Sequence, residues 1–342
     1  MAISNDLLSS TLYSIRDGEV DELFQKVAFL DAARKNGGIE KEAGGIKIQR
    51  PLSIAEHSTI TQLPTGYEPV SLAVKDVLQP AIYDWTDFTA PIIVTKKEEL
   101  ENSGEKAIVK IVEARMRSVM SMLRRELNKQ VLTGGSSILT TLNTLSPSKT
   151  AGFFEVETKA NQTHVVGGVS KASFNVNGWT NQIGDVGAAF GTNGVRVMQQ
   201  IYIGANSVSP IGDIGTVLLS ESGMANYRRA LFNQERYVSE KVLDGGRMSI
   251  AFAGAAVEQD LELNSLTATS SAASFNKTAP VTGYMLNFNG LKLVLHKDAD
   301  FSVSPFEHIA GTTARAAQLY VKCQLVADHL GSCGVIFDGN TY

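Results

Sequence analysis

The sequence contains only two cysteines in 342 residues, Cys323 and Cys333. Few cysteines are typical of a protein kept in a reducing compartment, so we expect buried thiols and no disulfide or metal site. No run of about 18 apolar residues occurs, and the first residues carry no basic flank ahead of an apolar stretch. These absences argue against membrane spanning and export, and they predict a cytoplasmic protein.

Strong charge of one sign is also missing. Lysine and arginine total 31 against 35 acidic residues, which gives a formal net charge of -4. A polycation that coats nucleic acid is therefore excluded, and any DNA contact must be local. Because 43% of the residues are hydrophobic, the chain can bury a large core or two modest ones, and disorder as the main state is excluded.

Motifs of catalysis are absent as well. There is no Walker A loop, no Gly-x-Gly-x-x-Gly and no Gly-x-Ser-x-Gly, and we interpret Gly191 to Gly194 as a turn before a helix. The five histidines lie far apart, without the spacing of metal ligands: His57, His164, His296, His308 and His329. We therefore expect no metal, no cofactor and no enzymatic activity.

The N-terminal part combines a helix with a long ribbon. Helical spacing of apolar residues predicts an amphipathic helix over residues 19 to 35, stopped by Gly37 and Gly38. Alternation from Gly45 to Thr95 predicts strands, interrupted by Pro51, Pro64, Pro69, Pro80 and Pro91. Since proline cannot donate to a central ladder, we expect a two-stranded ribbon with exposed edges that needs a partner surface.

Residues 96 to 133 give the strongest helical pattern, with one apolar stripe that would extend over roughly 50 Å. The stripe consists of Ile108, Val112, Met116, Val119, Leu123 and Leu127. The opposite face carries Lys106, Lys110, Arg117 and Arg124. This basic stripe has two interpretations, contact with a polyanion or an ordinary solvated face, and sequence alone favours the second because such spacing is common on solvent faces.

The remainder predicts a mixture of strands and helices, and hence an α+β protein. Residues 194 to 202 read as a helix, and the strand 217 to 219 leads into Ser220, a good N-cap for a further helix. Residues 264 to 280 read as a mobile loop or a domain tip. Further strands are expected at 284 to 287, 291 to 295, 319 to 325 and 335 to 337. Trp85 and Trp179 are isolated aromatics that we interpret as packing anchors.

The order of these parts resembles the HK97-like major capsid proteins of tailed bacteriophages, over nearly the whole chain. Several short stretches resemble that family: Tyr83-Asp84-Trp85, Ile92-Ile93-Val94, Asn102 to Glu105, Val166 to Val169 ahead of Trp179 and Asn181, Val217 to Ser220 before Tyr227-Arg228, Phe252 to Ala255, and Tyr284 to Asn287. None of them is a catalytic motif, and it is their order that carries the resemblance.

The resemblance implies five segments. They are an N-arm at 1 to 43, an extended E-loop hairpin at 44 to 95, a peripheral domain at 96 to 174 with the spine helix 96 to 133, an axial domain with a mixed sheet and flanking helices at 175 to 295, and a return to the peripheral domain and a final axial strand at 296 to 342. The N-arm and the E-loop would bury their apolar side chains only against neighbouring subunits, as in obligate interfaces.

The implied function is self-assembly, through pentamers and hexamers, into an icosahedral head around packaged double-stranded DNA. The implied partners are a separate scaffolding protein, a portal protein and possible decoration proteins, and the location is the virion after assembly in the host cytoplasm. Under this hypothesis Lys106, Lys110, Arg117 and Arg124 gain weight as non-specific contacts to DNA or scaffold. Two alternatives remain open: an encapsulin-type compartment of the same fold, and an intracellular α+β enzyme that forms a small oligomer.

Overall fold

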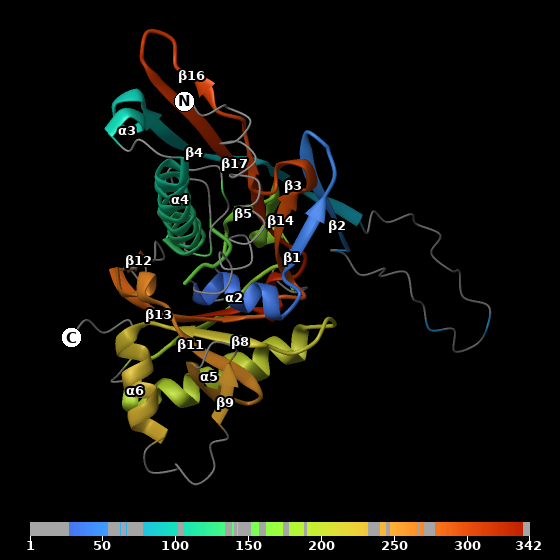
Figure 1. Ribbon diagram of the computed structural model, residues 1–342. Coiled ribbons are helices and arrows are strands. Elements are labelled where there is room, and N and C mark those ends of the chain that lie inside the picture. Colours follow the sequence, from blue (N-terminus) through green and yellow to red (C-terminus); the bar gives the residue numbers. More distant parts are fainter. Residues whose placement is uncertain are drawn as a thin grey trace.

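The computed structural model describes residues 27–53, 62, 66, 78–101, 105–133, 139, 142, 152–156, 162–173, 178–187, 190–231, 240–243, 247–265, 267–269 and 278–337. Within this part of the chain, most strands belong to two large sheets. Figure 1 shows the first sheet with α4 in the upper half of the molecule and the second sheet with α5 and α6 in the lower half. The predicted α+β class is confirmed.

The first sheet is organised around one long strand, β17 (Ala314–Ala327). One edge of β17 pairs with β4 (Thr86–Thr95), over ten residues in antiparallel register. The other edge pairs with β14 (Leu291–His296), β15 (Ser302–Val303) and β16 (Glu307–His308), and β1 (Ile39–Glu42) adds a parallel strand beyond β14. The β4 edge contains Pro91, as expected for an edge strand.

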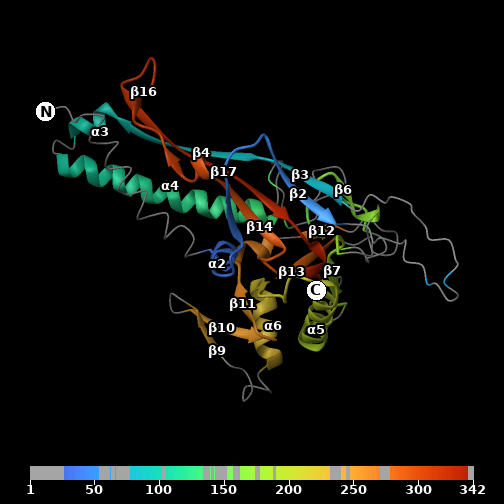
Figure 2. The same ribbon diagram turned by 90° about the vertical axis from the view of Figure 1, so that its right-hand side faces the viewer.

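Two helices follow β4, and the longer one covers the first sheet. These are α3 (Lys96–Glu101) and α4 (Glu105–Thr133), and Figure 2 shows α4 running alongside β4 and β17. The predicted stripe is buried at Val112, Met116, Leu123 and Leu127, while the side chain of Ile108 lies outside the described residues. The 29 residues of α4 span about 43 Å, less than the helix of 96 to 133 that we predicted, because α3 and α4 are separate helices.

A short N-terminal helix, α2 (Ala28–Lys35), fills the space between the two sheets. Its Phe29 ring packs on Phe288, with ring centroids 5.7 Å apart. Gly37 takes a φ of +68° after the last turn, which is the helix stop predicted from the glycine pair. The first part of the predicted helix, residues 19 to 26, lies outside the described residues.

The second sheet has the order β7, β18, β13, β8, β11, β10, β9, with β12 paired to β13. Its strands are β7 (Gln182–Asp185), β8 (Thr216–Leu219), β9 (Glu240–Leu243), β10 (Arg247–Phe252), β11 (Ala255–Gln259), β12 (Thr267–Thr269), β13 (Thr278–Leu286) and β18 (Gly334–Phe337). The sheet mixes parallel and antiparallel pairs.

Both faces of the second sheet are buried, with a period of two residues. Val217 and Met285 belong to the apolar cluster under α5 (Phe190–Val208) and α6 (Glu221–Leu231), whereas their neighbours Leu218 and Tyr284 belong to the cluster shared with the first sheet. The alternation follows from strand geometry, in which successive side chains point to opposite faces. The second sheet is therefore the middle layer between the α5/α6 helices and the rest of the chain.

Several local predictions are confirmed. Ser220 is the N-cap of α6, since its Oγ accepts the Gly223 amide at 3.2 Å. The strands predicted at 284 to 287, 291 to 295, 319 to 325 and 335 to 337 correspond to β13, β14, β17 and β18. Trp85 and Trp179 are buried, at 8% and 3% exposed.

Three other predictions are wrong. The segment 44 to 95 is not one ribbon, because β4 is a strand of the first sheet. Gly191 to Gly194 lies inside α5 instead of before it. The segment 264 to 280 is not a loop throughout, because it contains β12 and the start of β13, whereas its alternative interpretation as a domain tip stays a prediction. The predicted axial range of 175 to 295 stays a prediction. The other domain boundaries stay predictions.

Candidate functional site

The candidate site is a two-stranded ribbon formed by β2 (Lys47–Ser53) and β3 (Leu78–Asp84), which we call the ribbon. Figure 1 shows it on the side of the first sheet that carries β1. Pro51 and Pro80 lie directly opposite each other in its register. This position is a non-hydrogen-bonded pair, at which neither residue donates a backbone N–H to the other strand. The two proline rings are therefore accommodated without the loss of a ladder hydrogen bond.

The inner face of the ribbon is docked on its own chain. Ile48, Leu52, Ala81 and Tyr83 are at most 6% exposed. The Tyr83 hydroxyl donates to the carbonyl oxygen of Ala327 at 3.2 Å and accepts its amide at 3.4 Å. Our prediction that residues 45 to 95 cannot cover their apolar surface within one chain is thus wrong for this face.

Trp85 closes the base of the ribbon. Its indole Nε1 donates to the carbonyl oxygen of Gly45 at 3.1 Å, and its ring packs edge-on against His296 with centroids 5.4 Å apart. The Lys322 ammonium lies 5.9 Å from the centre of the same ring, within the range of a cation–π contact. The turn into β2 is therefore tied to β14 and β17.

A cluster of charges binds the ribbon to β1. Arg50 lies 2.7 Å from Glu40 and 3.0 Å from Glu42 through its NH2 group, and 3.7 Å from Asp328 through Nε. Burial alone would lower the pKa of Arg50, but the hydrogen bond to Glu40 and the surrounding carboxylates raise it above its ordinary value. The guanidinium therefore stays charged, and it joins three segments of the chain.

The outer face of the ribbon carries uncovered apolar side chains beside the polar Lys47, Gln49, Ser53 and Asp84. Ile82 and Leu78 are 39% and 69% exposed, and the exposed Pro51 and Pro80 lie between them in register. Ile46, just before β2, is 92% exposed. Contiguous apolar side chains on a surface are typical of interaction sites.

Glu98 lies in the first turn of α3 and is held by Thr95, the residue just before that helix. Glu98 accepts the Thr95 amide at 3.1 Å and the Thr95 hydroxyl at 2.8 Å, and the Glu98 amide donates back to that hydroxyl. This reciprocal arrangement is a capping box. The Arg115 hydrogen bond and those from Thr95 lower the pKa of Glu98 to about 2.

The predicted basic stripe on α4 is only partly supported. Arg117 is exposed and forms an ion pair with Glu113, one turn away, at 2.7 Å. Arg124 is 6% exposed, so it belongs to the interior and not to a solvated face. Helical spacing placed it with the other three, but packing around α4 covers that position. The side chains of Lys106 and Lys110 lie outside the described residues.

The cysteines and histidines form no chemical cluster in the part of the chain that the structure describes. Cys323 and Cys333 are buried and free, and burial raises the pKa of their thiols to about 12 and about 11. Burial also lowers the pKa of His329. Among the described helices, none combines the length and apolar character needed to cross a membrane. His57 lies outside the described residues.

Sequence reasoning missed the residues that hold the ribbon in place. Arg50 and Tyr83 were unremarkable members of strands, and Ala327 lies 244 residues beyond Tyr83. The one available signal was Arg50 itself, a charge within an alternating strand, since a charge on the inward-facing register predicts a partner.

No protein-family model and no curated protein matches the sequence. Solved structures do match. A cyanophage A-1(L) capsid matches with a TM-score of 0.53 at 15% identity, over 87% of this chain and 89% of that one. The holo-SrpI encapsulin complex from Synechococcus elongatus gives 0.52 at 11% identity, over 89% and 87%. A structure from Mycobacterium phage Ogopogo gives 0.51 at 10% identity, over 90% and 91%. The chain therefore has the HK97-like capsid fold.

Proposed function

We propose that this chain is the major capsid protein of a tailed bacteriophage, which self-assembles into an icosahedral head around double-stranded DNA. The observation that carries the proposal is the fold shared with a cyanophage A-1(L) capsid structure over 87% of the chain. The ribbon adds a reason within this chain, because its inner face is docked while its outer apolar face is left for another subunit. The role is structural and not catalytic.

The proposal includes partners inferred from the fold. Subunits would meet in pentamers and hexamers, with separate scaffolding and portal proteins and possible decoration proteins. Lys106, Lys110 and Arg117 of α4 are candidates for non-specific contact with DNA or scaffold, since sequence-independent contacts are made by cations to phosphates. Arg124 is not proposed for this role, because it is buried.

The test is assembly of the expressed full chain, alone and with its scaffold, followed by mass photometry and electron microscopy. Capsomers or closed particles are expected, and a dimer or tetramer alone would contradict the proposal. Leu78→Asp should abolish particles without unfolding the subunit, because it places a charge on the outer apolar face. Gln79→Asp is the matched control, since this exposed neighbour belongs to the opposite face and should leave assembly unchanged.

An encapsulin-type compartment is the second candidate, favoured by the encapsulin match. The contents of purified particles distinguish the two. Co-purifying protein cargo without nucleic acid favours the compartment, whereas DNA packaged in the presence of portal and terminase favours the phage head.

A further inference from the structure

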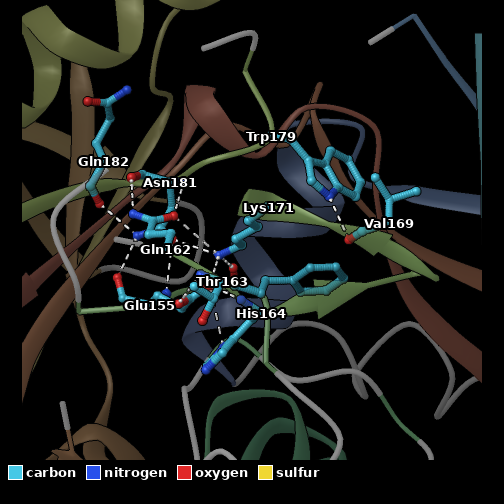
Figure 3. A network of polar contacts seen from close by, with 10 residues as sticks. Glu155, Gln162, Thr163, His164, Val169, Lys171, Trp179, Asn181 and Gln182 are labelled. Carbon is cyan, nitrogen blue, oxygen red and sulfur yellow. Dashed lines mark hydrogen bonds and ion pairs between the residues drawn. The ribbon is translucent and has the colours of Figure 1, made fainter. Parts of the chain in front are cut away.

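A polar network lies buried behind the ribbon, in four short segments that follow α4 in the chain. Figure 3 shows Glu155, Gln162, Lys171 and Asn181 pointing toward one another. Each is at most 2% exposed. Buried polar side chains are costly unless they are bonded, so their arrangement requires an explanation.

Lys171 is the centre of this network. Its Nζ donates to the carbonyl oxygen of Phe153 at 2.6 Å and to Asn181 Oδ1 at 2.9 Å, and it lies 3.4 Å from Glu155 Oε1. Burial lowers the pKa of Lys171 to about 8, while the Glu155 charge acts in the opposite direction. The ion pair therefore keeps the ammonium charged at neutral pH in a fully buried position.

The partners of Lys171 are held in turn. The Glu155 carboxylate accepts the amides of Thr163 at 3.0 Å and His164 at 2.8 Å. Asn181 Oδ1 also accepts the Glu155 amide at 2.9 Å. The network thus ties residues 153 to 155, 162 to 164, 171 and 181 into one unit, with none of the regular ladder bonds of a large sheet.

The network includes the residues that flank a small hairpin on both sides. This hairpin, β5 (Val165–Val166) and β6 (Val169–Ser170), begins directly after His164 and ends directly before Lys171. The Lys171 amide donates to the carbonyl oxygen of His164 at 2.9 Å and closes it. The position of the hairpin turn is therefore fixed by the network at its base.

The turn of the hairpin contacts the ribbon. The carbonyl oxygen of Gly167 accepts the Ile82 amide at 2.8 Å. Gly167 has a φ of +58°, and a Cβ there would come within 2.9 Å of the Ala81 side chain and 3.1 Å of the Tyr83 ring. Only glycine allows this approach without a shift.

The register of the ribbon makes Ile82 a specific reporter of this contact. Ile82 pairs with Gln49, two residues from the Pro51–Pro80 pair, so its amide points away from β2. The amides of Ala81 and Tyr83 point toward β2 by the same alternation. Loss of the hairpin contact should therefore speed hydrogen exchange at the Ile82 amide alone. Loss of the pairing between β2 and β3 should speed it at the amides of Ala81, Ile82 and Tyr83.

We infer that Lys171 and Glu155 are positioning residues for the ribbon: their buried ion pair fixes the hairpin, and the hairpin fixes the direction in which the ribbon offers its outer face. The inference rests on the proposed function insofar as that direction matters for assembly. The placement of the ribbon on the hairpin does not depend on it.

The test is residue-resolved hydrogen exchange on the full chain, as unassembled subunits or capsomers, in the Lys171→Met/Glu155→Gln double variant. Removing both partners avoids an uncompensated buried charge, so this variant is expected to fold. The Ile82 amide should exchange about tenfold faster, while Ala81, Tyr83 and the amides of β8 keep their protection. Lys47→Met is the control, because Lys47 forms only an exposed ion pair with Asp84 and should change nothing at Ile82.

Gly167→Ala provides an independent variant that acts at the other end of the same chain of contacts. It should give the same pattern at Ile82 without altering the network. The role of Lys171 and Glu155 would be overturned if the exchange rate of the Ile82 amide is unchanged in the double variant but rises in Gly167→Ala. The inference is also overturned if the double variant fails to fold, or exchanges faster at every amide, since the network would then serve the whole fold.

Particle formation separates this inference from the proposed function. If the wild-type chain forms no particles but Ile82 responds as expected, the capsid proposal fails and the positioning of the ribbon stands. The second case is that the wild type assembles and the double variant assembles equally well, although its Ile82 amide exchanges faster. The capsid proposal then stands, and the direction of the ribbon does not matter for assembly.

Discussion

The ribbon and the second sheet are held in different ways. The apolar cluster under α5 and α6 is built from β8, β11, β13, β18 and two helices, and it contains no buried ion pair among the described residues. The ribbon depends on single polar contacts, such as Tyr83 to Ala327, Ile82 to Gly167 and Arg50 to Glu40. In the second sheet, the stabilisation from apolar burial is distributed over many side chains. The direction of the ribbon depends on a few hydrogen bonds and ion pairs. We therefore expect the second sheet to determine the free energy of unfolding of the chain. We expect the polar contacts to determine the direction of the ribbon.

The largest effect is expected from Leu219→Ala in β8. Leu219 is fully buried in the second sheet, so truncation should lower the free energy of unfolding by about 2–5 kcal/mol. The midpoint of urea unfolding measures it. Leu78→Ala is the control, because this leucine of the ribbon is 69% exposed and its loss should change stability by less than about 0.5 kcal/mol. Equal effects from the two leucines would remove the distinction between the regions.

An intermediate effect is expected from Tyr83→Phe. The variant leaves the amide and carbonyl groups of Ala327 without their hydroxyl partner in a buried position, at a cost of about 1–3 kcal/mol. Hydrogen exchange should accelerate at Ala327 and along β3, but not in β8. Tyr202→Phe is a matched control in the second region, where the exposed hydroxyl bonds to Ala253, and it should have little effect. Faster exchange in β8 would show that the two regions do not open separately.

The smallest effect is expected from Glu98→Gln at the capping box. The pKa of Glu98 is lowered from 4.5 to about 2, so its contribution to stability is fully present above pH 4.5 and is lost as the pH falls toward 2. Because the side chain is 32% exposed, the ion pair with Arg115 should contribute no more than about 1 kcal/mol at pH 7. Urea unfolding at pH 7, 5, 4 and 3 should show the difference between variant and wild type shrinking with acidity. A difference independent of pH would contradict this assignment.

Sequence patterns predicted local features better than the pairing of distant strands. The Ser220 cap and the strands β13, β14, β17 and β18 depend on neighbours within a few residues, and they were found. The pairing of β4 with β17 joins residues more than 200 positions apart, and periodicity carries no information about such partners.

The candidate site was predicted in outline only. Alternation and prolines indicated a ribbon, and its exposed outer face was expected. The docking of its inner face was not expected, because the contacts of Tyr83 and Arg50 depend on the position of distant segments. Arg124 was assigned to a solvated face by helical spacing, which describes one helix and not what packs against it.

The contact between Tyr83 and Ala327 also orders events during synthesis. The ribosome makes β2 and β3 long before it makes Ala327, and β7 likewise waits for β18, about 150 residues later, before the second sheet can close. The nascent chain therefore cannot fix the direction of its ribbon through this contact until Ala327 has been translated. A chain that ends before Ala327 should therefore lack the contact that holds Tyr83, whatever else of it has folded.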